Sequence, residues 1–182
     1  MLTIGHSNRP LQEFLTLLQV HGVELLVDVR TVPRSRHNPQ FNQESLPASL
    51  ASIRVDYRHM PGLGGLRKPR KDSINTGWRN DSFRGYADYM QSAEFERNLE
   101  ELQGLERGRR VAIMCAESVP WRCHRGLIAD ALTARGVPVQ HILSAAQPRP
   151  HQLTRFARVE RRHVTYPPET LELFPQDPPG KQ

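Results

Sequence analysis

The hydrophobic positions of the chain fall into two kinds of pattern. Short apolar runs, typical of strands buried on both faces of a sheet, occur at residues 23–29 and 111–114, and residues 2–5, 55–58 and 138–143 also predict strands. Between these runs, apolar residues recur every three or four positions, which predicts helices over residues 11–21, 44–53, 82–102 and 122–135. Ser92 can cap a new helix, so we expect residues 82–102 to form two helices.

Strands that alternate with helices predict an α/β fold. We expect a single three-layer domain with a mainly parallel sheet of about five strands and helices on both faces. The length of 182 residues suits one domain. We assign residues 1–146 to the α/β domain, residues 147–174 to a C-terminal extension packed on the domain, and the proline-rich residues 175–182 to a disordered tail.

Unusual polar residues follow four of the predicted strands. They are His6, Ser7 and Asn8 after the first strand, Asp28 and Arg30 after the second, Tyr57 and His59 after the third, and Cys115 and Glu117 after the fourth. Parallel strands end at the same edge of a sheet, and folds of this kind bind their ligands beyond the carboxyl ends of the strands. A purely structural polar residue has no reason to prefer one end of its strand. The arrangement therefore predicts an active site at that edge.

The positive charge of the chain is concentrated in one segment. The net charge is +6, and residues 30–84 alone hold 11 Lys and Arg against 4 Asp and Glu. Such a segment predicts a nucleic acid or a phosphate-bearing small molecule as partner, unless it forms only a solvated face. We expect phosphate contacts from six basic residues, of which the last four lie within a long glycine-rich loop: Arg34, Arg36, Arg67, Lys68, Arg70 and Lys71.

Aromatic and cationic residues alternate near the start of the predicted helix at residue 82. Trp78, Arg79 and Arg84 resemble the side chains with which single-stranded nucleic acid sites stack on bases and hold phosphates. Tyr57 and His59 can stack on a base and hydrogen-bond to it in the same way. The other interpretation is a helix start whose aromatic residues pack in the core.

The stretch from residue 111 to 130 carries both cysteines of the protein. Cys115 is either a nucleophile activated by the following helix N-terminus and the nearby Arg122 and Arg125, or a small buried hydrophobic residue. Glu117 is either a general base or the ion-pair partner of one of these arginines. His124 either joins Cys115 in the site or packs on the following helix, and the same holds for Cys123.

The remaining candidate chemistry involves Asp28 and the histidines. Asp28 either forms a structural ion pair with Arg30 or orients one of His6, His59 and His124, as a carboxylate does in a catalytic triad.

Cysteines and histidines together also raise the question of zinc. Cys115, Cys123, His124 and His59 could in principle bind it. Seven residues separate the two cysteines, however, and zinc sites usually have a gap of about two to four residues. We therefore expect no metal and no other cofactor.

Five sequence motifs carry a family resemblance. They are TIGHSNR (3–9), LLVDVRTVPRSRHNPQFN (25–42), LGG (63–65), WRNDSFRGYADYM (78–90) and MCAESVPWRCHR (114–125). Together they resemble the bacterial family catalogued as domain of unknown function 488, over residues 1–143. The resemblance implies a compact α/β domain and supplies no reaction.

A weaker similarity links the chain to rhodanese-like domains, in which a cysteine opens an anion-binding loop before a helix. Here six residues separate Cys115 from Arg122, and Glu117 and Pro120 lie among them. This spacing departs from both the short sulfurtransferase loop and the loop of the cysteine phosphatases.

No stretch of the sequence approaches the ~20 apolar residues of a membrane span. The N-terminal residues also lack the basic and apolar regions of a secretory signal. We expect a cytoplasmic protein with reduced thiols and no membrane partner.

Taken together, these features predict an enzyme that acts on a nucleotide or nucleic acid. Hydrolysis or removal of a group at a base is the expected reaction, with Glu117 or Asp28 activating the attacking group, because such enzymes need stacking, a polar pocket and phosphate contacts together. One alternative is a thiol enzyme in which Cys115 carries a sulfur or another group. The other is a nucleic-acid-binding module without catalysis.

Overall fold

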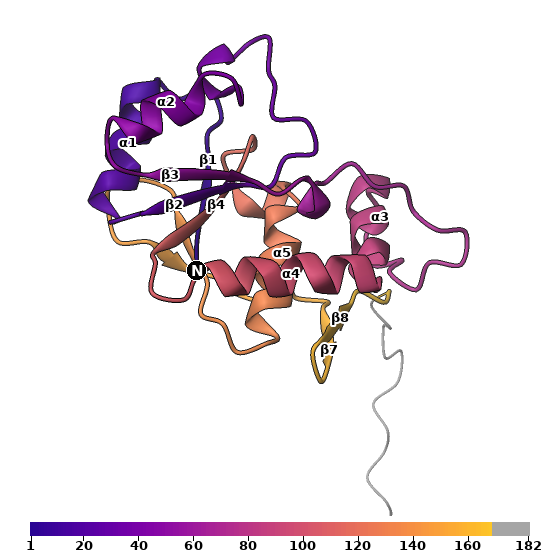
Figure 1. Cartoon of the computed structure of the whole chain (residues 1–182). Helices are drawn as coiled ribbons and strands as arrows, with labels where there is room; N and C mark the ends of the chain where they lie inside the picture. The colour runs from indigo at the N-terminus through magenta and orange to yellow at the C-terminus, as the bar shows by residue number, and fades with distance from the viewer. Residues whose placement is uncertain (169–182) are drawn as a thin grey trace, which may run out of the picture.

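The computed structural model of the chain describes residues 1–168. Its centre is a six-stranded sheet with the strand order β3-β2-β4-β1-β5-β6 (Figure 1). The strands of this sheet are β1 (Leu2–Gly5), β2 (Leu25–Asp28), β3 (Asp56–His59), β4 (Val111–Cys115), β5 (Gln140–Ile142) and β6 (Arg149–Pro150). Strands β1 to β5 run parallel, and β6 pairs antiparallel with β5. The predicted α/β fold with a mainly parallel sheet is confirmed.

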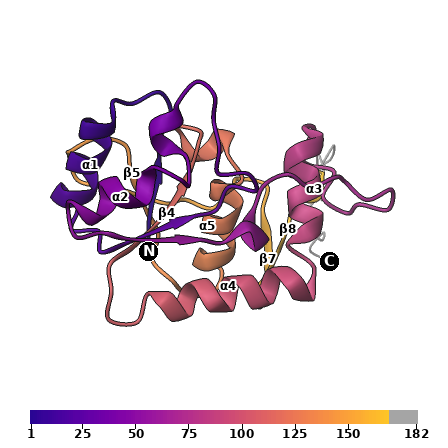
Figure 2. The same ribbon diagram turned by 45° about the horizontal axis from the view of Figure 1, so that its top comes forward.

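Helices cover both faces of the sheet. They are α1 (Leu11–Val20), α2 (Leu46–Ala51), α3 (Asp81–Tyr89), α4 (Ala93–Leu105) and α5 (Arg125–Thr133), with short 3-10 helices at Pro39–Phe41, Pro61–Leu63 and Pro120–Arg122. Helices α1 and α2 lie on one side of the sheet, and α4 and α5 lie on the other (Figure 1). Figure 2 shows α3 at the opposite end of the molecule from α1.

The side chains of the central strands alternate between these two helical layers. Leu26 and Met114 belong to the apolar cluster on the side of α1 and α2. Val27, Ile113 and Cys115 belong to the larger cluster on the side of α3, α4 and α5. The last residue of β4 therefore points its thiol toward the N-terminus of α5.

The predicted pair of helices over residues 82–102 is confirmed as α3 and α4. The side chain of Ser92 caps α4 by accepting a hydrogen bond from the backbone N–H of Phe95 at 3.2 Å. The helix predicted from residue 122 begins later, at Arg125. The reason is local, because Pro120–Arg122 forms a 3-10 helix and Cys123 is extended, with φ −142° and ψ 143°.

The segment after β5 folds back onto the domain. A hairpin of β7 (Arg158–Glu160) and β8 (His163–Thr165) follows β6. Asp130 of α5 is fully buried, and its carboxylate accepts hydrogen bonds from the hydroxyls of Thr154 (2.7 Å) and Tyr166 (2.8 Å). Two residues of the predicted extension, Thr154 and Tyr166, are thus bound to α5, while residues 169–174 and the predicted tail at 175–182 lie outside the described residues.

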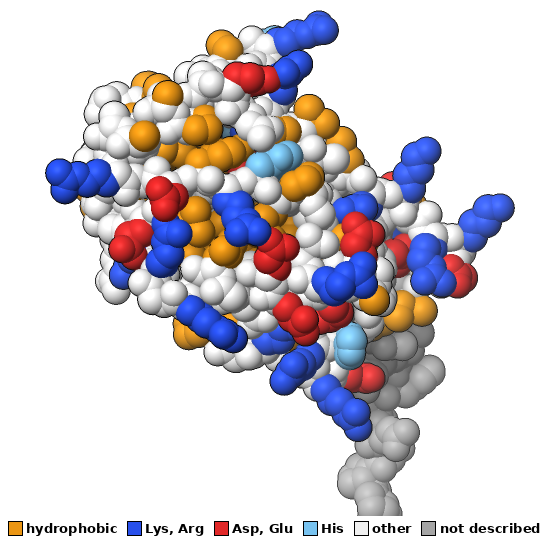
Figure 3. Space-filling view, viewed as in Figure 1, with side chains coloured by type: hydrophobic (Ala, Val, Ile, Leu, Met, Phe, Trp, Pro, Cys, Tyr) orange, Lys and Arg blue, Asp and Glu red, His pale blue; other side chains and the backbone are white. Residues whose placement is uncertain are grey.

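Charged side chains of both signs are mixed over the face shown in Figure 3. Blue Lys and Arg side chains lie beside red Asp and Glu side chains instead of gathering in one field. Within residues 1–168, no helix is long and apolar enough to cross a membrane.

Candidate functional site

The parallel strands bring the predicted polar residues to one edge of the sheet. Gly5 of β1 is paired with Cys115 of β4, and Asp28 of β2 is paired with both His59 and Met114. The chain leaves β1 through α1 on one face and leaves β4 through α5 on the other. The carboxyl ends of the neighbouring strands β1 and β4 therefore form a topological switch point, where open α/β sheets have their binding crevices.

Three side chains meet at the end of β4. Nδ1 of His124 lies 3.8 Å from the sulfur of Cys115 and 3.8 Å from the sulfur of Cys123. All three of these atoms lie within 4.8 Å of one another. Both cysteines are buried and free of disulfides, and His124 is partly buried. We call these three residues the Cys-Cys-His cluster.

Backbone contacts hold the ring of His124 in this position. Its Nε2 lies 3.0 Å from the carbonyl oxygen of Val29, just beyond the end of β2. A carbonyl oxygen only accepts, so Nε2 carries a proton and Nδ1 is the ring nitrogen that faces the two sulfurs. Gly65 packs closely against this ring, because a Cβ at this glycine would stand 2.4 Å from Nδ1.

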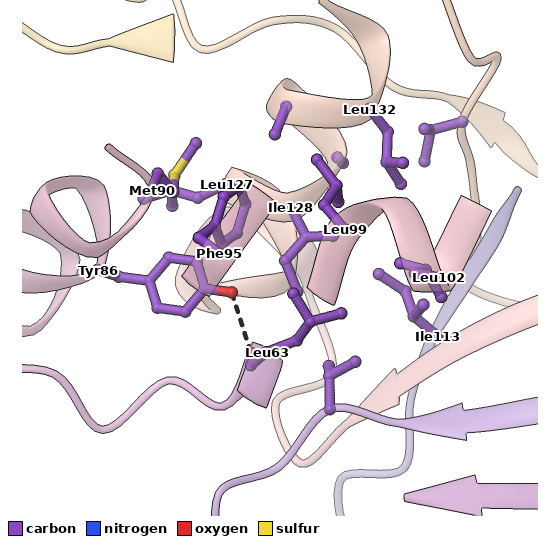
Figure 4. Close-up of a cluster of buried hydrophobic side chains, with 14 of the residues drawn as sticks. Leu63, Tyr86, Met90, Phe95, Leu99, Leu102, Ile113, Leu127, Ile128 and Leu132 are labelled. Atoms are coloured by element: carbon purple, nitrogen blue, oxygen red, sulfur yellow. Dashed lines mark hydrogen bonds between the residues drawn. The ribbon is translucent and has the colours of Figure 1, made fainter. Parts of the chain in front are cut away.

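An apolar layer supports the cluster from the side of α3 and α4. The rings of Tyr86 and His124 lie with their centroids 5.1 Å apart. Figure 4 shows how Tyr86 packs beside Phe95 and Leu127 and donates a hydrogen bond to the carbonyl oxygen of Leu63, at 2.9 Å. This core fixes the loop that carries Gly65 against the cluster.

The two thiols are electrostatically unlike. The neighbouring Cys123 thiol lowers the pKa of Cys115 well below its usual value. His124 and Arg125 also lower this pKa, whereas the burial of Cys115 acts to raise it. The Cys115 sulfur and burial raise the pKa of Cys123 well above the usual value. When the pair loses one proton, the negative charge therefore lies on Cys115, and the thiolate is the reactive form of a cysteine.

A cavity of about 310 Å³ opens above the Cys-Cys-His cluster. Its walls contain polar, charged and apolar groups. Besides the cluster, the lining residues are Arg30, Thr31, Val32, Gly65, Leu66, Ser82, Phe83, Ala116, Glu117 and Arg122. Within the described chain, the side chains of Glu117 and Arg122 are exposed and make no hydrogen bond or ion pair.

Arg125, by contrast, is buried in the structure and lies outside this lining. Its guanidinium donates hydrogen bonds to the backbone oxygens of Ile4 (2.9 Å), Glu117 (2.9 Å) and Ser118 (3.1 Å). It thereby shapes the loop after β4, and the side chain of Glu117 is left to face the cavity.

Asp28 and Arg30 form a second, largely buried network next to the cavity, whose lining includes Arg30. The Asp28 carboxylate accepts hydrogen bonds from Nη2 of Arg30 at 2.6 Å, from Nε of Arg30 at 2.9 Å and from the hydroxyl of Tyr57 at 2.8 Å. Burial raises the pKa of Tyr57, and the Asp28 charge adds to this effect. With its oxygens occupied in this way, Asp28 has the geometry of a structural ion pair rather than of a base facing a ligand.

The histidines predicted for the same edge are also engaged by the fold. His6 accepts a hydrogen bond from Nη1 of Arg30 at 3.2 Å and stacks on the ring of Phe41. Burial lowers the pKa of His6. His59 donates to the carbonyl oxygen of Arg30 at 2.8 Å. Together with Ser7 and Asn8, these histidines lie at the predicted edge and outside the lining of the cavity.

Several of the predicted phosphate contacts are tied into the structure. Arg67 lies over the ring of Tyr89 at 3.6 Å and donates to the carbonyl oxygen of Gly62. Arg34 pairs with Glu44, and Arg84 pairs with Asp81. Arg36 and Arg79 are exposed and lie away from the cavity lining.

Trp78 packs rather than lining the cavity. Its ring stacks on Phe83 with a centroid distance of 4.7 Å and meets Phe156 at 4.9 Å and Tyr166 at 5.6 Å. The structure thus places Trp78 between α3 and the C-terminal segment. Of Trp78 and Phe83, only Phe83 lines the cavity.

The sequence left open whether Cys123 joins the site and gave Gly65 no part in holding His124. The extended conformation of Cys123 and the close approach of Gly65 to His124 depend on contacts between distant segments. The adjacent Cys-His pair was the one local signal that pointed to Cys123.

Comparison with known proteins gives one result at the level of families. The model of a family described as "Domain of unknown function DUF488" matches residues 10–132, about two thirds of the chain. Neither the curated proteins nor the solved structures give a match to the chain.

Proposed function

Since the chain belongs to the family of domain of unknown function DUF488, whose description supplies no reaction, we propose its function from the site itself. The protein is an enzyme that acts on a nucleotide or nucleic acid, by hydrolysis or removal of a group at a base. The observation that carries this proposal is the cavity in which Glu117, Arg122 and apolar side chains meet directly above the Cys-Cys-His cluster.

The cavity suits a flat, partly apolar ring with a charged attachment. Its volume of about 310 Å³ lies at the lower end of the range of small-ligand sites. Leu66 and Val32 are largely exposed at 75% and 59%, and Phe83 completes the apolar wall. Arg122 offers a guanidinium beside this wall, and guanidinium groups bind phosphate in bidentate fashion.

Glu117 is the carboxylate that can activate water here. Of the two candidates, Asp28 is occupied by Arg30 and Tyr57, whereas Glu117 is exposed and lines the cavity. In the proposed step, Glu117 takes a proton from water while the water oxygen bonds to an electron-poor carbon of the substrate. The nitrogen that leaves this carbon, exocyclic or glycosidic, then takes that proton.

The test is a product analysis. Nucleotides and single-stranded DNA and RNA oligonucleotides are incubated with the protein, and mass spectrometry detects altered or released bases. We expect turnover by the wild type, a loss of at least about 100-fold in Glu117→Gln, as is typical of general bases, and no loss in Glu100→Gln, an exposed glutamate of α4. Salt-sensitive binding without turnover of any substrate would instead make the protein a binding module.

A second candidate function is favoured by the pairing of Cys115 with His124. A thiolate next to an imidazole is the arrangement of a nucleophilic cysteine, and the lowered pKa of Cys115 agrees with it. In this alternative, Cys115 carries a sulfur or acyl group during transfer. A covalent adduct on Cys115, trapped by mass spectrometry during turnover, would support it, and turnover by Cys115→Ser would exclude it.

A further inference from the structure

The Cys-Cys-His cluster has the composition of a metal site. Among residues 1–168, it is the group in which three histidine, cysteine or acidic side chains bring one ligand atom each within 4.8 Å. We propose that Cys115, Cys123 and His124 bind one divalent metal ion of the zinc class, with a remaining coordination position open to the cavity.

The distances fit a tetrahedral ion. Zinc binds cysteine sulfur at about 2.3 Å and histidine nitrogen at about 2.0–2.1 Å, so tetrahedral angles place a sulfur and a nitrogen about 3.6 Å apart. The two separations in the structure, from Nδ1 of His124 to the sulfurs of Cys115 and Cys123, are both 3.8 Å. Both separations differ from the tetrahedral value by about 0.2 Å.

The orientation of His124 points to the same conclusion. Histidines that bind metals almost always donate their other ring N–H to a carboxylate, a backbone carbonyl or water. In this protein the carbonyl of Val29 holds Nε2 at 3.0 Å, so Nδ1 is the nitrogen presented to the sulfurs. The imidazole is therefore oriented by the backbone before any metal arrives.

The chemistry of the donors selects the metal. Two thiolates and one imidazole favour zinc and similar ions over magnesium and calcium, which prefer oxygen ligands. Arg125 keeps a buried positive charge near the two sulfurs, and the backbone N–H of Arg125 lies 3.5 Å from the sulfur of Cys123. Structural zinc sites have four protein ligands, whereas catalytic sites keep a position for water or substrate. Here the cavity borders all three ligands.

His59 does not complete the set. Its Nε2 is bonded to the carbonyl oxygen of Arg30 at 2.8 Å, and it lies outside the three-residue group. The proposed site thus has three protein ligands, whereas four residues were considered from the sequence and no metal was expected. This inference extends the proposed function. Metal binding itself does not depend on that function, and only the role of a metal-bound water rests on it. A zinc ion held there would supply a water whose pKa is lowered to about 7, in the cavity that Glu117 also lines.

The test uses cobalt and zinc as probes. The reduced full-length protein is freed of metal with a chelator and titrated with Co²⁺, whose tetrahedral thiolate complexes absorb visible light. We expect one Co²⁺ per chain, displaced by one Zn²⁺. Cys115→Ser, Cys123→Ser and His124→Ala should each lower the affinity by more than about 10-fold, the loss already typical when a residue that only orients a ligand is changed.

Two controls separate ligand loss from misfolding. His163→Ala removes an exposed histidine of β8 and should leave metal binding unchanged. Circular dichroism should show the same helix content in all variants. Unchanged cobalt binding in the Cys115 and His124 variants would overturn the inference. Rapid formation of a Cys115–Cys123 disulfide together with no metal binding by the reduced protein would overturn it as well.

The outcomes for metal and function are distinguishable. A chain that binds one metal and turns over no nucleotide or oligonucleotide supports the metal site and contradicts the proposed function. A chain that turns these substrates over equally well with and without metal supports the function, and the absence of cobalt binding would then overturn the metal site.

Discussion

Nε2 of His124 lies 3.0 Å from the backbone carbonyl oxygen of Val29, and this contact aims Nδ1 at the sulfurs of Cys115 and Cys123. The carbonyl belongs to the residue after β2, which is the neighbour of β4 in the sheet. The alignment of β2 with β4 thus sets the orientation of the imidazole relative to the thiol at the end of β4. The site depends on strand register and not on the side chain at position 29.

Gly65→Ala is expected to disable the cluster without removing any of its three side chains. The new methyl group would stand 2.4 Å from Nδ1 of His124, so the ring must move. We predict at least about a tenfold loss of cobalt affinity, the scale seen when ligand orientation is lost. The measurement is the cobalt titration described above.

Gly104→Ala is the matched control for this change. No atom lies within 4 Å of a Cβ at Gly104 in helix α4. The substitution should leave cobalt affinity unchanged and raise the free energy of unfolding by roughly 0.5–1 kcal/mol. Equal affinities in both alanine variants would show that Gly65 does not position His124.

Replacement of Asp28 and of Glu117 by the corresponding amide should change the free energy of unfolding by different amounts. Asp28→Asn leaves the buried guanidinium of Arg30 without its charge partner, and we predict a loss of about 3–5 kcal/mol in the free energy of unfolding. Glu117→Gln changes an exposed side chain and should alter stability by less than about 0.5 kcal/mol. Urea unfolding of both variants measures this difference. A stable Asp28→Asn protein would contradict the structural role given to the ion pair.

Acid should weaken the fold in a defined pH range through His141. Burial lowers the pKa of His141 from 6.5 to about 4, with His151 and Arg125 acting in the same direction. Between pH 6.5 and about 4 the unfolded chain therefore binds a proton that the folded chain does not, so stability is complete above this range and falls as the pH falls through it. The shift corresponds to roughly 3 kcal/mol.

This effect is checked by urea unfolding at pH 7 and pH 5. His141→Gln removes the titration, so the loss of stability between the two pH values should be smaller in this variant than in the wild type. His6 lies under the same kind of burial and contributes in the same direction, so part of the loss remains. An unchanged pH dependence in His141→Gln would contradict the assignment.

Tyr166 should prove to be an anchor of the C-terminal segment. Its hydroxyl donates to the buried carboxylate of Asp130 at 2.8 Å. Tyr166→Phe removes a hydrogen bond to a charged group and should cost about 1.5–3 kcal/mol in the free energy of unfolding. Tyr89→Phe removes a hydrogen bond to the neutral carbonyl of Gly62 at a half-buried position and should cost about 1 kcal/mol or less. Equal costs would contradict the anchoring role.

The regular elements were predictable because their patterns are local. Apolar runs located β2 and β4, short stretches between predicted turns and helices located β1, β3 and β5, and helical spacing with Ser92 as a cap located α3 and α4. Strand β6 escaped prediction because it has two residues, one of them a proline, and carries no apolar run. Strand order depends on contacts between distant segments, so the position of β4 between β2 and β1 could not be derived from spacing.

The location of the candidate site could be predicted from the sequence, but the roles of its individual residues could not. The parallel sheet brings Asp28, Cys115 and the residues around them to one edge, as their positions after strands predicted. Which of them faces the cavity was decided by long-range packing. Asp28 is enclosed by Arg30 and Tyr57, whereas Cys123, separated from Cys115 by seven residues, is returned to it by the turn before α5.

The central claim is that substrate binds in the cavity above the Cys-Cys-His cluster, and the most direct test is protection of Cys115. In reduced, metal-free Cys123→Ser protein, Cys115 is the remaining thiol, and its rate of alkylation can be followed by mass spectrometry. A nucleotide or single-stranded oligonucleotide, at a concentration that saturates its binding by fluorescence anisotropy, is predicted to slow this rate at least about tenfold, because a bound base covers the thiol. The same rate with and without bound ligand would contradict the claim.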